Sequence, residues 1–241
     1  MNALHRNETA MRRTVIVALV SAAAVVSVGC GSQTPADCQL QSSANGPYII
    51  KFTQSAAVTP GCEANTPDEF ADEWQFDPFD NGLIVGFNPR SDLPDPSNPD
   101  APIYAKGHFD QDFPGGDNLC TVSDMSNLEV TGTDPANYEI RDLAFLNTAL
   151  YLGTTFKADV TYTHNSCTRT YTAQAMNPYR TCATKEDCDP FAQPFASGIN
   201  SQYDTDCIKD AWATTHTDDP DTGICFFVGP FPGLGGWKPV Q

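Results

Sequence analysis

The sequence predicts an all-β protein in which an antiparallel β-sandwich is followed by a disulfide-rich, mostly irregular C-terminal segment. From residue 48 to about residue 176, short apolar or alternating runs are separated by clusters of Pro, Gly, Asn and Asp. That pattern is typical of antiparallel strands joined by turns. The chain also holds nine cysteines in 241 residues, and four of them lie close together near the C-terminus. Such a density indicates disulfides. No long stretch of helical periodicity interrupts the strand pattern.

The expected sandwich consists of six short strands followed by a hairpin. Each strand is a run of apolar or alternating residues that begins and ends at turn-forming residues. The candidates are Tyr48–Phe52, Glu73–Phe76, Leu83–Phe87, Ile103–Phe109, Leu119–Val122, Glu139–Leu146 and the hairpin Phe156–Ala175.

The hairpin gives the strongest local signal in the chain. With Asn165 and Ser166 as a two-residue turn, Phe156 lies opposite Ala175, and the polar residues of both strands alternate on the outer face. This register also places Cys167 on the inner face. Asn-Ser forms such a turn less readily than Asn-Gly, so a four-residue loop is the alternative.

After residue 178 the chain becomes rich in Asp, Pro and Thr, with closely spaced cysteines. Small modules that cannot fill a core use disulfides for stability. We interpret Thr181–Phe227 as such a module or as a cap on the sandwich, with a short helix near Tyr203–Trp212. Structural zinc is disfavoured, because five residues separate Cys182 from Cys188 and zinc sites use closer pairs.

The cysteine count suits an exported protein if Cys30 is set aside. Eight cysteines then remain, and an even number is expected where thiols are oxidised in pairs. Proximity along the chain suggests Cys38 with Cys62, Cys120 with Cys167, and two bridges among the last four, although eight cysteines allow about 105 pairings. The eight are Cys38, Cys62, Cys120, Cys167, Cys182, Cys188, Cys207 and Cys225.

The first thirty residues contain a secretory signal. Arg12 and Arg13 precede an apolar run from Val15 to Val28, which is too short for an ordinary membrane span and ends in small residues. Met11 is an alternative start, because the signal is complete from that residue onward.

The end of this signal, Val26-Ser27-Val28-Gly29-Cys30, resembles the lipobox of bacterial lipoproteins, in which a peptidase cuts before a diacylated cysteine. Ser27 departs from the family pattern, where Leu is usual. The resemblance is confined to the leader and implies that Cys30 carries the lipid. Cleavage by ordinary signal peptidase after a small residue such as Ala24 is the alternative.

The same resemblance implies a location and a domain plan. Gly31 stands where Asp would retain a lipoprotein in the inner membrane, so the outer membrane or cell surface is expected, and a secreted or periplasmic protein is the alternative. Residues 1–29 would be the signal peptide, 30–47 a flexible tether, 48–177 the sandwich and 178–241 the cysteine-rich segment. This layout is similar to that of uncharacterised cysteine-rich lipoproteins and implies no activity.

The charge balance excludes one class of partner. With 30 acidic and 13 basic side chains, the chain has a formal net charge of −17. Phosphate backbones would repel it, so no nucleic-acid partner is expected. The expected partner is the membrane, which the chain contacts through its lipid. The sequence does not identify a glycan or protein ligand at the cell surface.

No catalytic motif is found, so we expect a protein that is not an enzyme. The nucleophile elbow of serine hydrolases and the paired histidines of metalloproteases are both absent. His108, His164 and His216 occupy turn-like or strand-end positions, where solvated side chains are expected. Glu73, beside Trp74, is the one carboxylate we name for the alternative of an extracellular hydrolase.

A surface module that binds glycans or calcium is the other alternative. Asp-rich loops are typical of calcium sites. Aspartates in turns also accept hydrogen bonds from backbone amides, and we expect the aspartates here to have that structural role. No cofactor is therefore expected. A sugar platform would need exposed aromatic side chains. The calcium candidates are Asp110, Asp112, Asp117, Asp218, Asp219 and Asp221, and the aromatic candidates are Trp74, Tyr104, Phe109 and Phe113.

Overall fold

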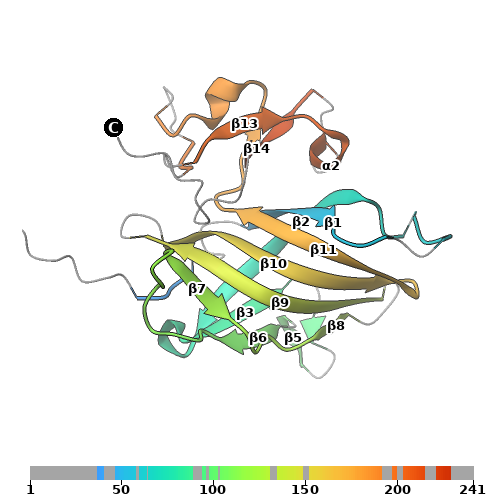
Figure 1. Cartoon of the computed structure of the whole chain (residues 1–241), viewed down its shortest axis with the longest axis vertical. Coiled ribbons are helices and arrows are strands. Elements are labelled where there is room, and N and C mark those ends of the chain that lie inside the picture. The colour runs from blue at the N-terminus through green and yellow to red at the C-terminus, as the bar shows by residue number, and fades with distance from the viewer. Residues whose placement is uncertain are drawn as a thin grey trace, which may run out of the picture. The chain divides into compact units, whose positions relative to one another are not determined.

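The computed structural model of the chain confirms an all-β fold with antiparallel sheets (Figure 1). The described residues, from Asp37 onward, belong to one compact unit. The structure describes residues 37–40, 47–57, 60–63, 65–88, 94–95, 98–102, 104–130, 135–148, 152–191, 197–199, 203–214 and 221–228.

The main sheet contains nine antiparallel strands in the order β6-β3-β2-β1-β11-β10-β9-β7, with β8 paired to another part of β9. Its strands are β1 (Tyr48–Gln54), β2 (Glu69–Phe79), β3 (Ile84–Asn88), β6 (Ala105–His108), β7 (Leu119–Val122), β8 (Leu128–Val130), β9 (Ala136–Asn147), β10 (Leu152–His164) and β11 (Cys167–Met176). The 3-10 helix η2 (Asp80–Gly82) links β2 to β3, and β4 (Pro94–Asp95) pairs with β5 (Asn98–Pro102).

The predicted hairpin is confirmed in its register. Phe156 lies opposite Ala175, and Asn165 and Ser166 form the two-residue turn between β10 and β11. Both turn residues have positive φ angles, 49° and 66°, which is the geometry of the mirror-image turns that match strand twist. Each of the other predicted strands overlaps a strand of the main sheet, although Ile103 lies outside the described residues.

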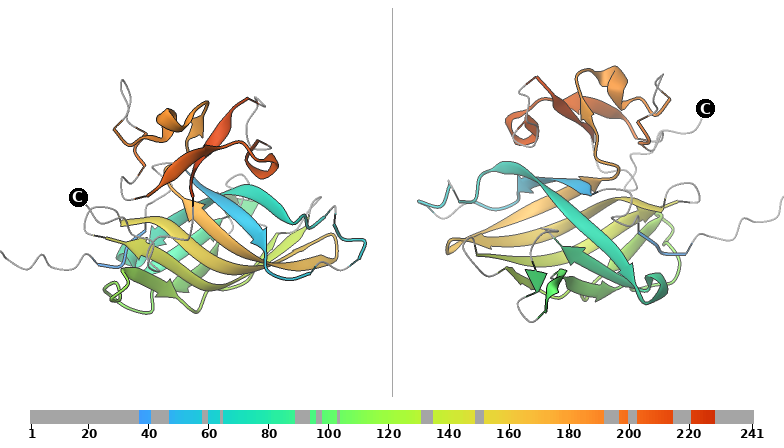
Figure 2. Two further views of the ribbon diagram at one scale, coloured as in Figure 1. Left: turned by 45° about the horizontal axis from the view of Figure 1, so that its top comes forward. Right: turned by 180° about the vertical axis from the view of Figure 1, so that it is seen from behind.

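The sheet bends until its two ends meet, which gives the near-barrel arrangement (Figure 2). The seam joins β6 to the segment after β7: Ser126 N–H donates to the Lys106 carbonyl at 2.9 Å, and Asp110 N–H donates to the Thr121 carbonyl at 2.9 Å. Gly107 lies at this seam. A Cβ there would stand 2.6 Å from a Val122 methyl group, so a larger residue would push the seam apart.

The space inside the bent sheet is filled mainly by aromatic side chains. Trp74 lies at the centre, 4.1 Å from the Phe87 ring and 5.2 Å from the Phe52 ring, measured between ring centroids. The Phe52 ring meets Trp74 edge-on, and aromatic contacts of this kind stabilise a core beyond the burial of area alone. The large, fully buried rings are Trp74, Tyr48, Tyr171, Phe52, Phe76, Phe87, Phe145 and Phe156.

The C-terminal segment covers part of the outer face of the sheet. It contains the three-stranded sheet β12-β14-β13, made of β12 (Thr181–Cys182), β13 (Thr205–Ile208) and β14 (Gly223–Phe227), with the 3-10 helix η3 (Lys185–Cys188) and the short helix α2 (Ala211–Thr214). These elements lie over β1, β2 and β11 in Figure 1.

A second apolar cluster forms where this segment meets the sheet. Ile49 and Met176, which are paired on the outer face of β1 and β11, are buried with Ile224 and Trp212 of the segment. The Tyr203 hydroxyl shares hydrogen bonds with the hydroxyls of Thr154 and Thr155 on β10, at 3.2 and 2.9 Å. The segment is therefore a cap on the sheet.

The helix expected near Tyr203–Trp212 is wrong for most of that range. Residues 205–208 form a strand, and only 211–214 are helical. The reason is that Cys207 lies directly opposite Cys225 in the ladder between β13 and β14. Pairing with the buried strand β14 outweighs the weak helical spacing of this segment.

All eight predicted cysteines form disulfides, but two of the predicted pairings are wrong. Cys38 bonds Cys120 and Cys62 bonds Cys167, across 82 and 105 residues of sequence. The sheet pairs β1 with β11, and the segment before β1 reaches β7, so neighbours in space are distant along the chain. The two bridges expected within the last four cysteines are present, as Cys182–Cys207 and Cys188–Cys225.

This connectivity predicts a definite peptide map. Tryptic digestion of non-reduced protein should link the peptide with Cys38 to the one with Cys120, and the peptide with Cys62 to the one with Cys167. Replacing Cys38 and Cys120 together by Ala should lower the free energy of unfolding by about 2–5 kcal/mol in urea titration, because a long loop is no longer closed. A direct link between the Cys38 and Cys62 peptides would contradict the fold.

A buried arginine closes one end of the near-barrel. The Arg169 guanidinium, on the inner face of β11, donates to the Thr66 carbonyl at 2.6 Å, to the Asp68 carboxylate at 2.7 Å and to the Gln54 side chain. Its side chain is only 1% exposed. Arg169 therefore fastens the loop between β1 and β2, which also carries Cys62, to β11.

Replacing Arg169 by Leu should destabilise the protein strongly, by about 2–4 kcal/mol in the free energy of unfolding, because buried acceptors lose their donor. Arg141→Leu is the matched control. Its side chain is 70% exposed and pairs with Glu139 on the surface, so a change within about 0.5 kcal/mol is expected. Equal effects of the two variants in urea titration would contradict the role given to Arg169.

Candidate functional site

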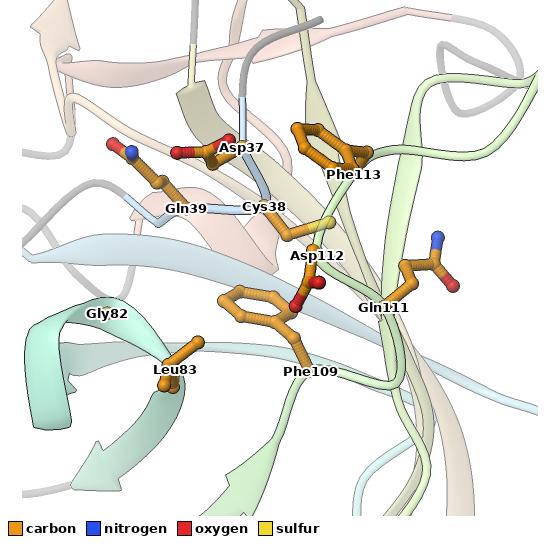
Figure 3. A pocket seen from close by; sticks show the side chains of 9 residues that line it. All are labelled: Asp37, Cys38, Gln39, Gly82, Leu83, Phe109, Gln111, Asp112 and Phe113. Atoms are coloured by element: carbon orange, nitrogen blue, oxygen red, sulfur yellow. The ribbon is translucent and has the colours of Figure 1, made fainter.

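A hollow of about 310 Å³ lies where the described chain enters the fold (Figure 3). Its lining combines the N-terminal segment, the turn after η2 and the loop before β7. The lining residues are Asp37, Cys38, Gln39, Gly82, Leu83, Phe109, Gln111, Asp112 and Phe113.

The N-terminal segment is held firmly at this hollow. The disulfide from Cys38 joins it to β7, and Cys38 N–H donates to the Asp112 carbonyl at 2.8 Å. Gly153 of β10 lets the segment pass closely, because a Cβ there would stand 2.5 Å from the Gln39 carbonyl oxygen. The first described residues, Asp37 to Leu40, are therefore held at a fixed point beside the hollow.

The loop between β6 and β7 forms the opposite wall. Gly115 N–H donates to the Leu119 carbonyl at 3.0 Å, and the Gln111 side-chain amide donates to the same carbonyl at 2.8 Å. Asn118 adopts a positive φ of 61°, which turns the chain back into β7. These bonds fix the part of the loop that presents Asp112 and Phe113.

The hollow is amphipathic. Leu83 and Phe113 are 54% and 50% exposed, whereas Phe109 is half-buried and packs edge-on against the core ring of Phe145 at 6.0 Å. Figure 3 shows the Phe109 ring beside the Cys38 side chain, with the carboxylates of Asp37 and Asp112 at the same opening. This lining can contact an apolar group while its carboxylates stay in water.

A second hollow of about 660 Å³ lies over strands β7, β9 and β10. Four aspartates and one lysine contribute to its lining: Asp110, Asp117, Asp142, Asp159 and Lys157. Its character is therefore acidic, as is that of the chain as a whole.

The predicted calcium ligands have structural partners where they are described. The Asp110 carboxylate accepts bonds from the Ser123 hydroxyl and amide at 2.6 and 3.1 Å, and Asp117 accepts the Leu119 amide at 3.1 Å. Asp112 lies at the other hollow, and no three acidic side chains among the described residues bring their ligand atoms within 4.8 Å of one another. Asp221 is exposed beside β14, and Asp218 and Asp219 lie outside the described residues.

The three sulfurs of Cys182, Cys188 and Cys225 do lie within 4.8 Å of one another. All three cysteines are disulfide-bonded, so they offer no thiolate to a metal. The packing of two disulfides against each other explains the cluster.

The four aromatic candidates for a sugar platform do not come together on one exposed surface. Trp74 is fully buried in the aromatic core and cannot stack on a ligand. The Tyr104 hydroxyl donates to the Asp77 carboxylate at 2.6 Å, and burial together with this carboxylate raises the pKa of Tyr104 above its usual range. Phe109 and Phe113 remain together, at the amphipathic hollow.

The histidines lie on different elements. The His108 ring, at the end of β6, is 2.8 Å from the Asp124 carboxylate, while His164 is the last residue of β10, next to the hairpin turn. His216 lies outside the described residues. Glu73 lies on β2, opposite Ile49 of β1. Asp110 and Asp124 both belong to the seam of the near-barrel, a connection that the sequence did not reveal.

Sequence reasoning missed the amphipathic hollow, because its walls come from segments about 30 to 45 residues apart that only the closed sheet brings together. The cysteine at position 38 was the one available signal. A bridge from it to Cys120 would have placed the N-terminal segment beside the loop before β7.

Within the part of the chain that the structure describes, no helix has the length and apolar character needed to cross a membrane.

Comparison with known proteins gives one match. The MlpA family matches residues 51–178, which is more than half of the chain. The chain belongs to the MlpA family. The matched region begins within β1 and ends just after β11, so it contains the main sheet except the first three residues of β1, and it includes the loop that carries Asp112 and Phe113. No curated protein and no solved structure matches the chain.

The seam predicts a weakness in acid. Hydrogen bonds from the Ser123 side chain lower the pKa of Asp110, and those from the His108 amide and ring lower the pKa of Asp124. Because the folded pKa lies below the unfolded value of about 3.9, the stabilisation is complete above that pH and is lost as the pH falls through the lower folded value.

The free energy of unfolding should therefore decrease below about pH 4, and it should decrease less steeply in the double variant Asp110→Asn, Asp124→Asn, because its seam no longer carries carboxylates that titrate. Asp189→Asn, next to η3 in the C-terminal segment, is the matched control and should keep the wild-type slope. Urea titrations between about pH 2.5 and pH 6 measure these slopes. Parallel slopes for the double variant and the wild type would contradict the role of the seam.

Proposed function

We propose that this chain is a lipid-anchored, non-enzymatic protein of the outer membrane or cell surface, attached through Cys30. The observation that carries the proposal is the leader that ends in Val26-Ser27-Val28-Gly29-Cys30 and resembles a lipobox. A diacylated cysteine, with a further chain where one is added, provides the two hydrophobic signals that stable anchoring requires.

The cysteine pairing supports this assignment. Each of the eight cysteines in the described part of the chain has a disulfide partner there, and Cys30 is the ninth. In an oxidising compartment an unpaired thiol would exchange with the disulfides or link two chains. Acylation of Cys30 removes that thiol and leaves the four bridges undisturbed.

The geometry near the N-terminus also supports an anchor. The first described residues, Asp37 to Leu40, are fastened by a disulfide and by the close approach of Gly153. Between Cys30 and Asp37 lie six residues rich in Ser, Gln and Pro, which suit a short spacer. An attachment at Cys30 would therefore hold the fold close to the membrane without straining the sheet.

The non-enzymatic part of the proposal is supported by what the candidate chemical groups do. His108 pairs with Asp124 at the seam, and the Asp110 carboxylate binds the Ser123 hydroxyl and amide. Trp74 is fully buried in the core, and the Tyr104 hydroxyl donates a hydrogen bond to the Asp77 carboxylate. Side chains that hydrogen-bond to the fold in this way act as structural groups.

Metabolic labelling with an alkyne-bearing fatty acid tests the anchor. The wild-type chain should take up the label and remain with the membrane fraction, whereas Cys30→Ser should lose both properties. Ser27→Leu is a matched variant that restores the usual lipobox residue, and it should be labelled at least as well as the wild type. Undiminished labelling of Cys30→Ser would refute the proposal.

A further inference from the structure

We propose that the end of the near-barrel around the amphipathic hollow rests on the membrane, with Leu83 and Phe113 in contact with its interfacial region. This inference depends on the anchor at Cys30. It adds which face of the fold meets the lipid and which side chains make the contact.

The length of chain between the anchor and the fold limits the distance from the membrane. Asp37 follows Cys30 by seven residues, and seven fully extended residues span at most about 25 Å. Asp37 and Cys38 line the hollow, and the Cys38–Cys120 disulfide fixes their position. The hollow therefore lies within reach of the membrane surface in any arrangement of the intervening residues.

Exposed apolar side chains gather at this end of the fold. Four large apolar residues of the described chain are well exposed, and two of them, Leu83 and Phe113, line this one hollow. The half-buried ring of Phe109 lies with them and joins the patch to the core. Exposed apolar side chains that line one hollow favour a contact with a membrane or a partner, and the nearby anchor favours the membrane.

The two exposed side chains are presented by ordered backbone. Leu83 ends the turn of η2, its N–H donates to the Asp80 carbonyl at 3.3 Å, and its own carbonyl accepts the Phe109 N–H at 3.3 Å. Phe113 follows Asp112, whose carbonyl accepts Cys38 N–H at 2.8 Å. Because the backbone is already ordered, contact with lipid requires little further loss of conformational entropy.

Charge limits how deeply this end can enter. The carboxylates of Asp37 and Asp112 stand at the same opening, and transfer of a charged carboxylate into hydrocarbon is very unfavourable. Aromatic and apolar side chains at the level of the headgroups, with carboxylates in water, satisfy both constraints. The contact we propose is therefore shallow, and it should be strongest on membranes without excess negative charge.

Lipid-depth quenching tests the proposal on the full-length, lipidated protein in phosphatidylcholine vesicles. Leu83→Trp and Phe113→Trp each place a reporter in the proposed contact. Phe191→Trp is the matched control, because Phe191 is 74% exposed and lies in the C-terminal segment. The wild-type emission is subtracted in each case. Both reporters should lose roughly half of their emission when the lipids carry bromine near the headgroup end of the acyl chains, because the tryptophans would lie at that depth.

The outcomes separate the inference from the anchor. Protein that carries the fatty-acid label and floats with the vesicles, but shows the same quenching at positions 83 and 113 as at 191, overturns the membrane contact and leaves the anchor standing. Protein that lacks the label refutes the anchor, and the inference with it. Reporter emission that shifts with protein concentration and does not respond to brominated lipid would assign the patch to a second copy of the chain and would also overturn the proposal.

Discussion

The fold depends on closing one sheet around an aromatic core. Trp74, Phe76 and their neighbouring rings lie on one face of β1, β2, β3 and β9 to β11, and only the bending of the sheet removes that face from water. A flat sheet of the same strands would expose these rings and two open edges, both of which favour aggregation. Burial of the core therefore requires the seam between β6 and the segment after β7. The carboxylates of Asp110 and Asp124 help to hold it.

The same closure positions the features that matter for function. It brings the turn after η2 beside the loop before β7, and the Cys38–Cys120 disulfide adds the N-terminal segment to them. The amphipathic hollow is thus a by-product of how the near-barrel ends. Its lining includes Asp37 and Cys38, which follow the proposed lipid anchor at Cys30 by only a few residues.

The sequence was informative wherever the structure depends on neighbouring residues. Alternation of apolar and polar residues was enough to predict the register of the β10–β11 hairpin, because a shift by one residue would reverse both faces. It was not enough to pair the cysteines. The entropy of closing a loop grows slowly with its length, so closeness along the chain was a poor guide, and the bridge from Cys62 to Cys167 spans 105 residues.

The hollow and the cap on the outer face depend on contacts of the same long-range kind. Trp74 and Phe113 were both candidates for an aromatic platform on the surface, and only Phe113 is exposed. Both residues have acidic neighbours in the sequence. They differ in exposure because Trp74 lies on β2 and faces the interior of the near-barrel, whereas Phe113 lies in the loop before β7. Asp117 was easier to interpret, since its carboxylate accepts the amide of Leu119, two residues further along the chain.

The cap has a consequence for the MlpA family. The shared region ends at residue 178, yet Met176 within it and Ile49 just before it are buried against side chains of the C-terminal segment. Any member that lacks such a segment must cover this face by another route, either with polar side chains at these two positions or with a different extension. Among members of the family, a change in the segment after residue 178 should therefore be accompanied by changes in the side chains on the outer face of β1 and β11.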